Sequence, residues 1–105
     1  MINLDDTDIY VPNTKAMRNL LESLNYTITP FNSRVPIEPI RYRAIGFSEW
    51  ITHFEEVKQT NKMYYCMNAP TLTEDQSIFM FNILHVCPDY STFKEALQQY
   101  INSNP

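Results

Sequence analysis

The stretch from Ser77 to Cys87 constrains the fold of this chain more than any other segment. On a helical wheel its apolar side chains cover essentially the whole circumference, and only Ser77, Asn82 and His85 interrupt them. A helix that is apolar on every side must be buried on every side, or another chain must cover part of it. Because Ile, Phe and Val also favour strands, a buried strand remains the alternative to a helix here. The apolar residues of the stretch are Ile78, Phe79, Met80, Phe81, Ile83, Leu84, Val86 and Cys87.

The chain offers limited material to bury such a segment. At 105 residues it is expected to form one domain, spanning residues 1–105, and a two-layer domain of this size usually covers one side of a helix. A last helix over about residues 90–102 can cover a second side. Complete burial within the chain and an apolar strip left for a partner are therefore both open. The candidate interface residues are Phe79, Met80, Phe81, Leu84, Tyr90 and Tyr100.

The remaining periodicities predict an α+β domain. Alternating, β-rich segments predict strands over residues 8–11, 26–29, 40–45 and 63–67. Helical spacing predicts helices over 14–24, 47–59, about 74–86 and about 90–102. The order is β-α-β-β-α-β followed by two helices, so a ferredoxin-like split β-α-β arrangement is one possibility for the first six elements, and it implies no function.

Two of these helices carry recognisable start signals. Asn13 is the expected N-cap of the helix over 14–24, in which the apolar residues recur at i, i+3, i+4 and i+7. Thr73 with Gln76 fits a capping box for the third helix, and Thr71 with Glu74 fits one shifted by two residues.

Composition excludes several classes of protein. The one glycine, Gly46, rules out nearly every glycine-rich phosphate loop. Residues 1–8 are acidic where a secretory signal is basic and then apolar. The longest apolar-dominated run, over residues 78–87, is shorter than the roughly 20 residues that cross a bilayer. We therefore expect a soluble, cytoplasmic protein with no membrane partner.

Glu49, His53 and Glu56 form the one arrangement that imitates a metal or acid–base site. At i, i+4 and i+7 of a helix they share one face, where an imidazole and two carboxylates can hold an ion. That face lies opposite the apolar stripe of the same helix, so a hydrated surface is the favoured interpretation. A small metal-dependent enzyme stays an alternative, and no bound metal or cofactor is expected.

Histidine and cysteine also suggest a nucleophilic pair. Residues i and i+2 diverge on a helix, so His85 and Cys87 cannot hydrogen-bond each other there, while a pairing of His85 with Cys66 stays open. Nothing in the sequence supplies an oxyanion site or an orienting carboxylate. We expect a histidine at the edge of the core, two buried reduced thiols and no catalysis; a Cys66–Cys87 bridge is not excluded by spacing.

A basic patch forms the third candidate site. Arg34, Arg41, Tyr42 and Arg43 bring three of the eight basic residues into ten positions, and arginines beside an aromatic ring on a strand can hold single-stranded nucleic acid. Tyr42 would face away from both neighbouring arginines, however, and the net charge is −4. Nucleic-acid binding is thus the alternative function and is not expected, because an acidic chain attracts phosphates poorly.

The absence of a catalytic constellation, the small size and the acidity favour a protein-binding module that acts by stoichiometric association. An inhibitor, immunity or adaptor protein, for example one encoded by a phage or mobile element, suits these features. Small acidic inhibitors gain association speed from complementary charge on basic targets. The partner is expected to be another protein, and a homodimer is an open alternative.

Overall fold

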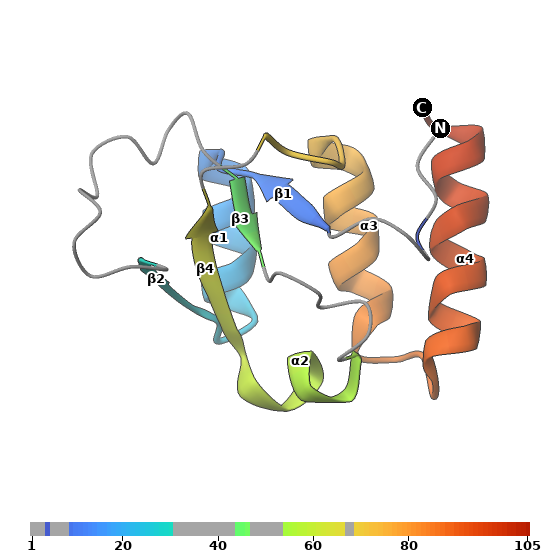
Figure 1. Ribbon diagram of the computed structural model, residues 1–105, viewed down its shortest axis with the longest axis horizontal. Helices are drawn as coiled ribbons and strands as arrows, with labels where there is room; N and C mark the ends of the chain where they lie inside the picture. Colours follow the sequence, from blue (N-terminus) through green and yellow to red (C-terminus); the bar gives the residue numbers. More distant parts are fainter. Residues whose placement is uncertain (1–3, 5–8, 31–43, 47–53, 67–68) are drawn as a thin grey trace.

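The computed structural model describes residues 4, 9–30, 44–46, 54–66 and 69–105, and the fold is an α+β domain (Figure 1). The predicted order of elements is confirmed. The elements are β1 (Tyr10–Pro12), α1 (Lys15–Ser23), β2 (Thr27–Pro30), β3 (Ala44–Gly46), α2 (Phe54–Thr60), β4 (Lys62–Cys66), α3 (Glu74–Leu84) and α4 (Tyr90–Ser103). The stretch that admitted either a helix or a buried strand is helical as far as Leu84.

The four strands form one mixed sheet in the order β1-β3-β4-β2. β3 pairs antiparallel with both β1 and β4, while β2 and β4 are parallel. This pairing departs from the ferredoxin-like possibility. In a split β-α-β unit the two strands are parallel and another strand separates them, whereas β3 and β4 are adjacent and antiparallel. The chain therefore reverses through α2 instead of crossing over the sheet.

Both edge strands of this sheet end in a proline. Pro12 closes β1 and Pro30 closes β2, and among the described strands each of these two has a single neighbour. Proline lacks the amide hydrogen of the ladder, so it is tolerated at an edge but not in a central strand. The prolines that the sequence places after its strand patterns thus limit how far each edge extends.

The first helix begins one residue later than the sequence predicts. Thr14, in an extended conformation, is the N-cap, and its Oγ1 accepts a hydrogen bond from the Met17 amide at 3.2 Å. The predicted cap, Asn13, precedes it. The expected apolar stripe is confirmed, since Met17 and Leu21 are buried and Leu20 is packed against the same core.

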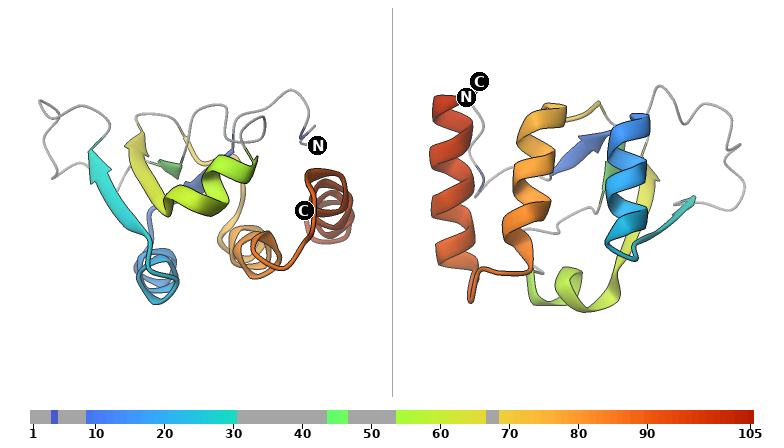
Figure 2. Two further views of the ribbon diagram at one scale, coloured as in Figure 1. Left: turned by 90° about the horizontal axis from the view of Figure 1, so that it is seen from below. Right: turned by 180° about the vertical axis from the view of Figure 1, so that it is seen from behind.

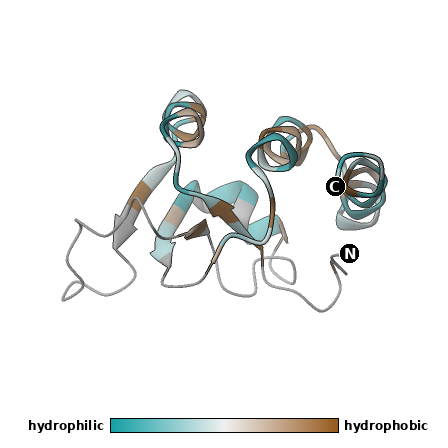
Figure 3. Ribbon diagram, turned by 90° about the horizontal axis from the view of Figure 1, so that it is seen from above, coloured by the Kyte–Doolittle hydropathy of each residue, from teal (hydrophilic) through white to brown (hydrophobic). Residues whose placement is uncertain are grey.

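Three helices lie in one layer on one side of the sheet (Figures 2 and 3). α1 and α3 cover the sheet, and α4 lies beside α3 on the side away from α1. One cluster of buried side chains joins the sheet to all three helices. Its members include Val11 and Ile45 from the sheet, Leu21 from α1, Leu84 from α3 and Leu97 from α4. Within the residues that the structure describes, no helix has the length and apolar character needed to span a membrane.

Thr71 fastens the start of α3 to the sheet. Its Oγ1 accepts a hydrogen bond from the Tyr10 amide at 2.8 Å and donates one to the Tyr10 carbonyl at 3.1 Å. The Thr71 amide donates to the same carbonyl at 2.9 Å. The shifted capping box, in which Thr71 would cap a helix, is therefore wrong, because its hydroxyl is already bonded to β1.

Gly46 of β3 pairs with Tyr10 of β1 and has no room for a side chain. A Cβ added at this residue would meet the Ile9 carbonyl oxygen at 2.7 Å and the Tyr10 Cα at 3.2 Å. Both are backbone atoms, so Gly46→Ala forces the two strands apart. We expect a loss of about 1–3 kcal/mol in the free energy of unfolding, the usual cost of overpacking. Urea denaturation measures it, and an unchanged midpoint would contradict this strand contact.

Candidate protein-binding surface

The N-terminus of α3 is fixed by the capping box that the sequence predicts. The Gln76 amide donates to Thr73 Oγ1 at 3.2 Å, and the Thr73 amide donates to Gln76 Oε1 at 2.9 Å. The Gln76 side chain also donates through Nε2 to the carbonyl of Asn104 at 2.7 Å, beyond the end of α4. α3 and α4 are thus held together at this end by a buried amide.

The inner face of α3 belongs to the core. Met80, Phe81 and Leu84, three of the six candidate interface residues, are buried. The sequence-based proposal placed these three residues on a binding surface, and their burial in the core corrects it. The sheet lies beneath this face, and α1 and α4 flank it, so the chain itself covers these side chains (Figure 3).

The outward face of α3 carries the apolar residues that the chain does not cover fully. At about 100° per residue, Ile78, Phe79, Ile83 and Val86 fall on an arc of about 140° centred opposite Ser77 and Leu84, and the exposed Asn82 falls on the same arc. We call the four apolar residues of this arc the outer strip. The first three are half-buried, whereas Val86, in the turn that continues α3, is 76% exposed. No other large hydrophobic residue in the described part of the chain is exposed.

Phe79 and Tyr100 extend this surface towards α4. Their rings are stacked, with centroids 4.0 Å apart and an angle of 8° between the planes, and both side chains are half-buried. Tyr90, the remaining candidate, lies elsewhere: its ring is 5.9 Å from that of Phe54 and 6.4 Å from that of Phe93. Of the six candidates, Phe79 therefore belongs to the outer strip and Tyr100 borders it. Sequence reasoning missed Ile78, Ile83 and Val86 as its members, although the helical wheel contained them.

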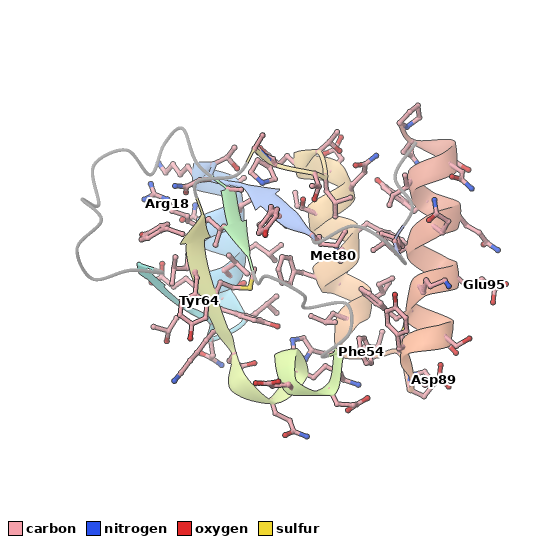
Figure 4. All side chains as sticks on the ribbon, viewed as in Figure 1. Arg18, Phe54, Tyr64, Met80, Asp89 and Glu95 are labelled. Atoms are coloured by element: carbon pink, nitrogen blue, oxygen red, sulfur yellow. The ribbon has the colours of Figure 1, made fainter. Side chains whose placement is uncertain are left out.

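An acidic side chain lies near each end of the outer strip. Asp75 is exposed in the first turn of α3, and the strip itself is uncharged. Asp89 follows Val86 in the α3–α4 loop and caps α4, accepting a hydrogen bond from the Thr92 amide at 2.7 Å (Figure 4). The hydrogen bonds from Thr92 lower the pKa of the Asp89 carboxyl below its usual value, so this group is ionised at neutral pH.

His85 is bonded to a tyrosine and not to a thiol. As C-cap of α3 it lies at the edge of the core, where the Tyr26 hydroxyl and His85 Nε2 are 2.9 Å apart. Burial raises the pKa of Tyr26 to about 12. Burial, and then the charge of Lys58, lower the pKa of His85. A neutral imidazole can accept a hydrogen bond at Nε2 from the Tyr26 hydroxyl, so these shifts preserve the bond.

The thiol at Cys87 is free and buried. Its carbonyl accepts a hydrogen bond from Lys58 Nζ at 3.1 Å, and the same ammonium lies 4.9 Å from the centroid of the Phe54 ring. The expectation of a buried reduced thiol is confirmed for Cys87, whereas the side chain of Cys66 lies outside the described residues.

The pKa of His85 predicts an acid-side loss of stability. A histidine whose pKa is lowered in the folded state contributes stability that is present above its unfolded pKa of about 6.5 and is lost as the pH falls through its folded pKa. We expect the urea midpoint to decrease as the pH falls from about 7 to below 6.5. His85→Gln should flatten this decrease, because glutamine offers an uncharged acceptor. An equally steep decrease in the variant would contradict this role.

Several sequence candidates lie outside the described residues. These are Glu49 and His53 of the proposed metal site and all four residues of the basic patch, Arg34, Arg41, Tyr42 and Arg43. Glu56, the third member of the metal site, lies in α2. The described residues contain no group of three or more His, Cys, Asp or Glu side chains placed to hold a metal ion.

Comparison of this chain with protein-family models, with curated proteins and with solved structures gave no match. Its function is therefore inferred from its own residues.

Proposed function

We propose that this chain is a small acidic protein-binding module that acts by stoichiometric association, as an inhibitor, an immunity protein or an adaptor does, and that the outer strip is its contact surface. One observation carries the proposal: Val86 is 76% exposed in the turn that follows α3, and three apolar side chains on the outward face of α3 are only half-buried. Apolar residues gathered on one face mark an interaction site more often than scattered ones do.

The energetics support association at this face. Covering Val86 and the exposed parts of Ile78, Phe79 and Ile83 would remove apolar surface worth roughly 3–5 kcal/mol from water. Aromatic residues are enriched in the cores of protein interfaces, and the stacked rings of Phe79 and Tyr100 lie at the α4 side of the strip. The net charge of −4 favours rapid encounter with a basic target. A cytoplasmic inhibitor or immunity protein of a phage or mobile element fits this size and charge.

Affinity capture with a matched pair of variants tests the proposal. Val86→Glu introduces a charge into the outer strip, and Asn19→Glu introduces the same charge at an exposed position of α1. Wild type and Asn19→Glu should capture the same protein from an extract of the source organism, and Val86→Glu should not. Calorimetry with the purified partner should then give a fixed stoichiometry. Turnover of a substrate, or capture unaffected by Val86→Glu, would contradict the proposal.

A further inference from the structure

We propose that the occupant of the outer strip is an amphipathic helix of a partner protein, with an apolar face and a lysine or arginine near each end of that face. This inference rests on the proposed function and deepens it, because it names the chemistry of the partner at the same surface. It follows from the shape of the strip and from the charges at its ends.

The shape of the strip is that of a helical ridge. Phe79, Ile83 and Val86 are spaced i, i+4 and i+7, so their side chains follow one another along α3, with Ile78 beside them. A second helix packs against such a ridge by taking it into the groove between its own rows of side chains, with apolar residues at i, i+3, i+4 and i+7. From Asp75 to Val86 the ridge is about 16 Å long at 1.5 Å per residue, which about three turns of a partner helix would match.

The charges favour a basic partner over a second copy of this chain. The ridge is uncharged, and Asp75 at one end and Asp89 at the loop end are both exposed carboxylates. In a two-fold dimer α3 lies either antiparallel to its copy, so that Asp75 approaches the copy's Asp89, or parallel to it, so that each aspartate approaches its own counterpart. Each chain also has a net charge of −4. Like charges facing each other oppose pairing, whereas basic residues at the two ends of a helix complement this pattern.

The basic groups of the described residues near this end are already engaged. Lys58 Nζ donates to the Cys87 carbonyl and lies over the Phe54 ring. Burial and the nearby Lys58 lower the pKa of His85, which keeps its imidazole neutral at pH 7. Neither Lys58 nor His85 therefore neutralises the negative charge that Asp89 presents to a partner.

Two synthetic peptides of about 18 residues serve as probes, both with leucine at i, i+3, i+4 and i+7. One has lysine at the other positions and one has glutamate. Fluorescence anisotropy should show that the Leu/Lys peptide binds the full chain in a one-to-one complex, with a rise in helical circular dichroism, and that the Leu/Glu peptide does not. Val86→Glu should weaken binding by about tenfold or more, and Asn19→Glu by less than about twofold.

A second pair of variants separates the proposed site from general attraction between opposite charges. Asp75→Asn with Asp89→Asn removes both end charges and keeps α4 capped, because asparagine caps as well as aspartate. Glu22→Gln with Glu95→Gln removes two charges elsewhere; Figure 4 shows Glu95 pointing away from α3. The first pair should weaken binding of the Leu/Lys peptide about fivefold more than the second.

Three results would overturn the inference. They are equal weakening by the two charge pairs, equal binding of the two peptides, and light scattering that shows a dimer which Val86→Glu dissociates. If the peptides fail while a captured protein still requires Val86, the proposed function stands and the basic helix is wrong. If neither the peptides nor any protein depends on Val86, both proposals fall.

Discussion

Replacement of Phe93 by alanine is expected to lower the free energy of unfolding by about 3–5 kcal/mol, the range for a buried aromatic side chain. Phe93 is 1% exposed, and its ring centroid lies 5.1 Å from that of Phe54. It therefore joins α4 to α2 and to the central core. Since small domains are stable by only about 5–15 kcal/mol, this single change removes a large part of the total.

Urea denaturation followed by circular dichroism measures this effect. Ser91→Ala is the matched control, because Ser91 is exposed in the first turn of α4, two residues before Phe93. The control should change stability by less than about 0.5 kcal/mol. If Phe93→Ala does not fold, Phe93→Leu should fold with a loss of about 1–1.5 kcal/mol. A loss no greater than that of the control would show that α4 is not packed on the core as described.

Leu84→Ala and Val86→Ala are expected to differ sharply although the two residues are two positions apart. Leu84 is 0% exposed, so its truncation leaves a cavity beneath α3 and costs about 2–5 kcal/mol. Val86 is 76% exposed, and its truncation should cost less than about 0.5 kcal/mol in the isolated chain.

The comparison of these two variants measures which face of α3 is covered. Thermal and urea unfolding of both variants at low protein concentration provide the data. Similar losses for the two would mean that Val86 is covered as well, and the outer strip would no longer be available to a partner.

Much of the secondary structure could be predicted because patterns within short segments of the chain determine it. The alternation of the strands, the spacing of Met17 and Leu21, and the pair Thr73 and Gln76 each act within a few residues of the chain. Strand pairing could not be predicted in the same way. The parallel pairing of β2 with β4, for example Ile28 beside Met63, depends on how distant segments pack and leaves no local signal.

The face of α3 that lies on the core could not be predicted, because the helix is apolar all round. Hydropathy points the wrong way at two positions. Ser77, which interrupts the apolar pattern, is fully buried, and its hydroxyl donates to the Thr73 carbonyl at 2.6 Å. Val86, which belongs to the apolar pattern, is exposed. A serine hydroxyl that donates to a carbonyl of the preceding turn has its hydrogen bond satisfied within the helix, so the serine can be buried while a valine is exposed.

The site around His85 was beyond sequence reasoning for a different reason. The hydroxyl that bonds His85 belongs to Tyr26, which is 59 residues away in the chain. From the sequence alone, His85 is a candidate partner only of the cysteine thiols. The two rings come together, with centroids 5.9 Å apart, only because the residues that follow α1 pack against the C-terminal end of α3.

The amide of Gln76 has a consequence for how the molecule opens. Its oxygen completes the cap of α3 and its nitrogen holds the backbone just past α4, so the first turn of one helix and the last turn of the other share a single buried side chain. Fraying at the end of α4 would leave that nitrogen without a protein acceptor in a site only 4% exposed. The two helices therefore form one cooperative unit in local unfolding, and slow amide exchange should extend across both of these turns together.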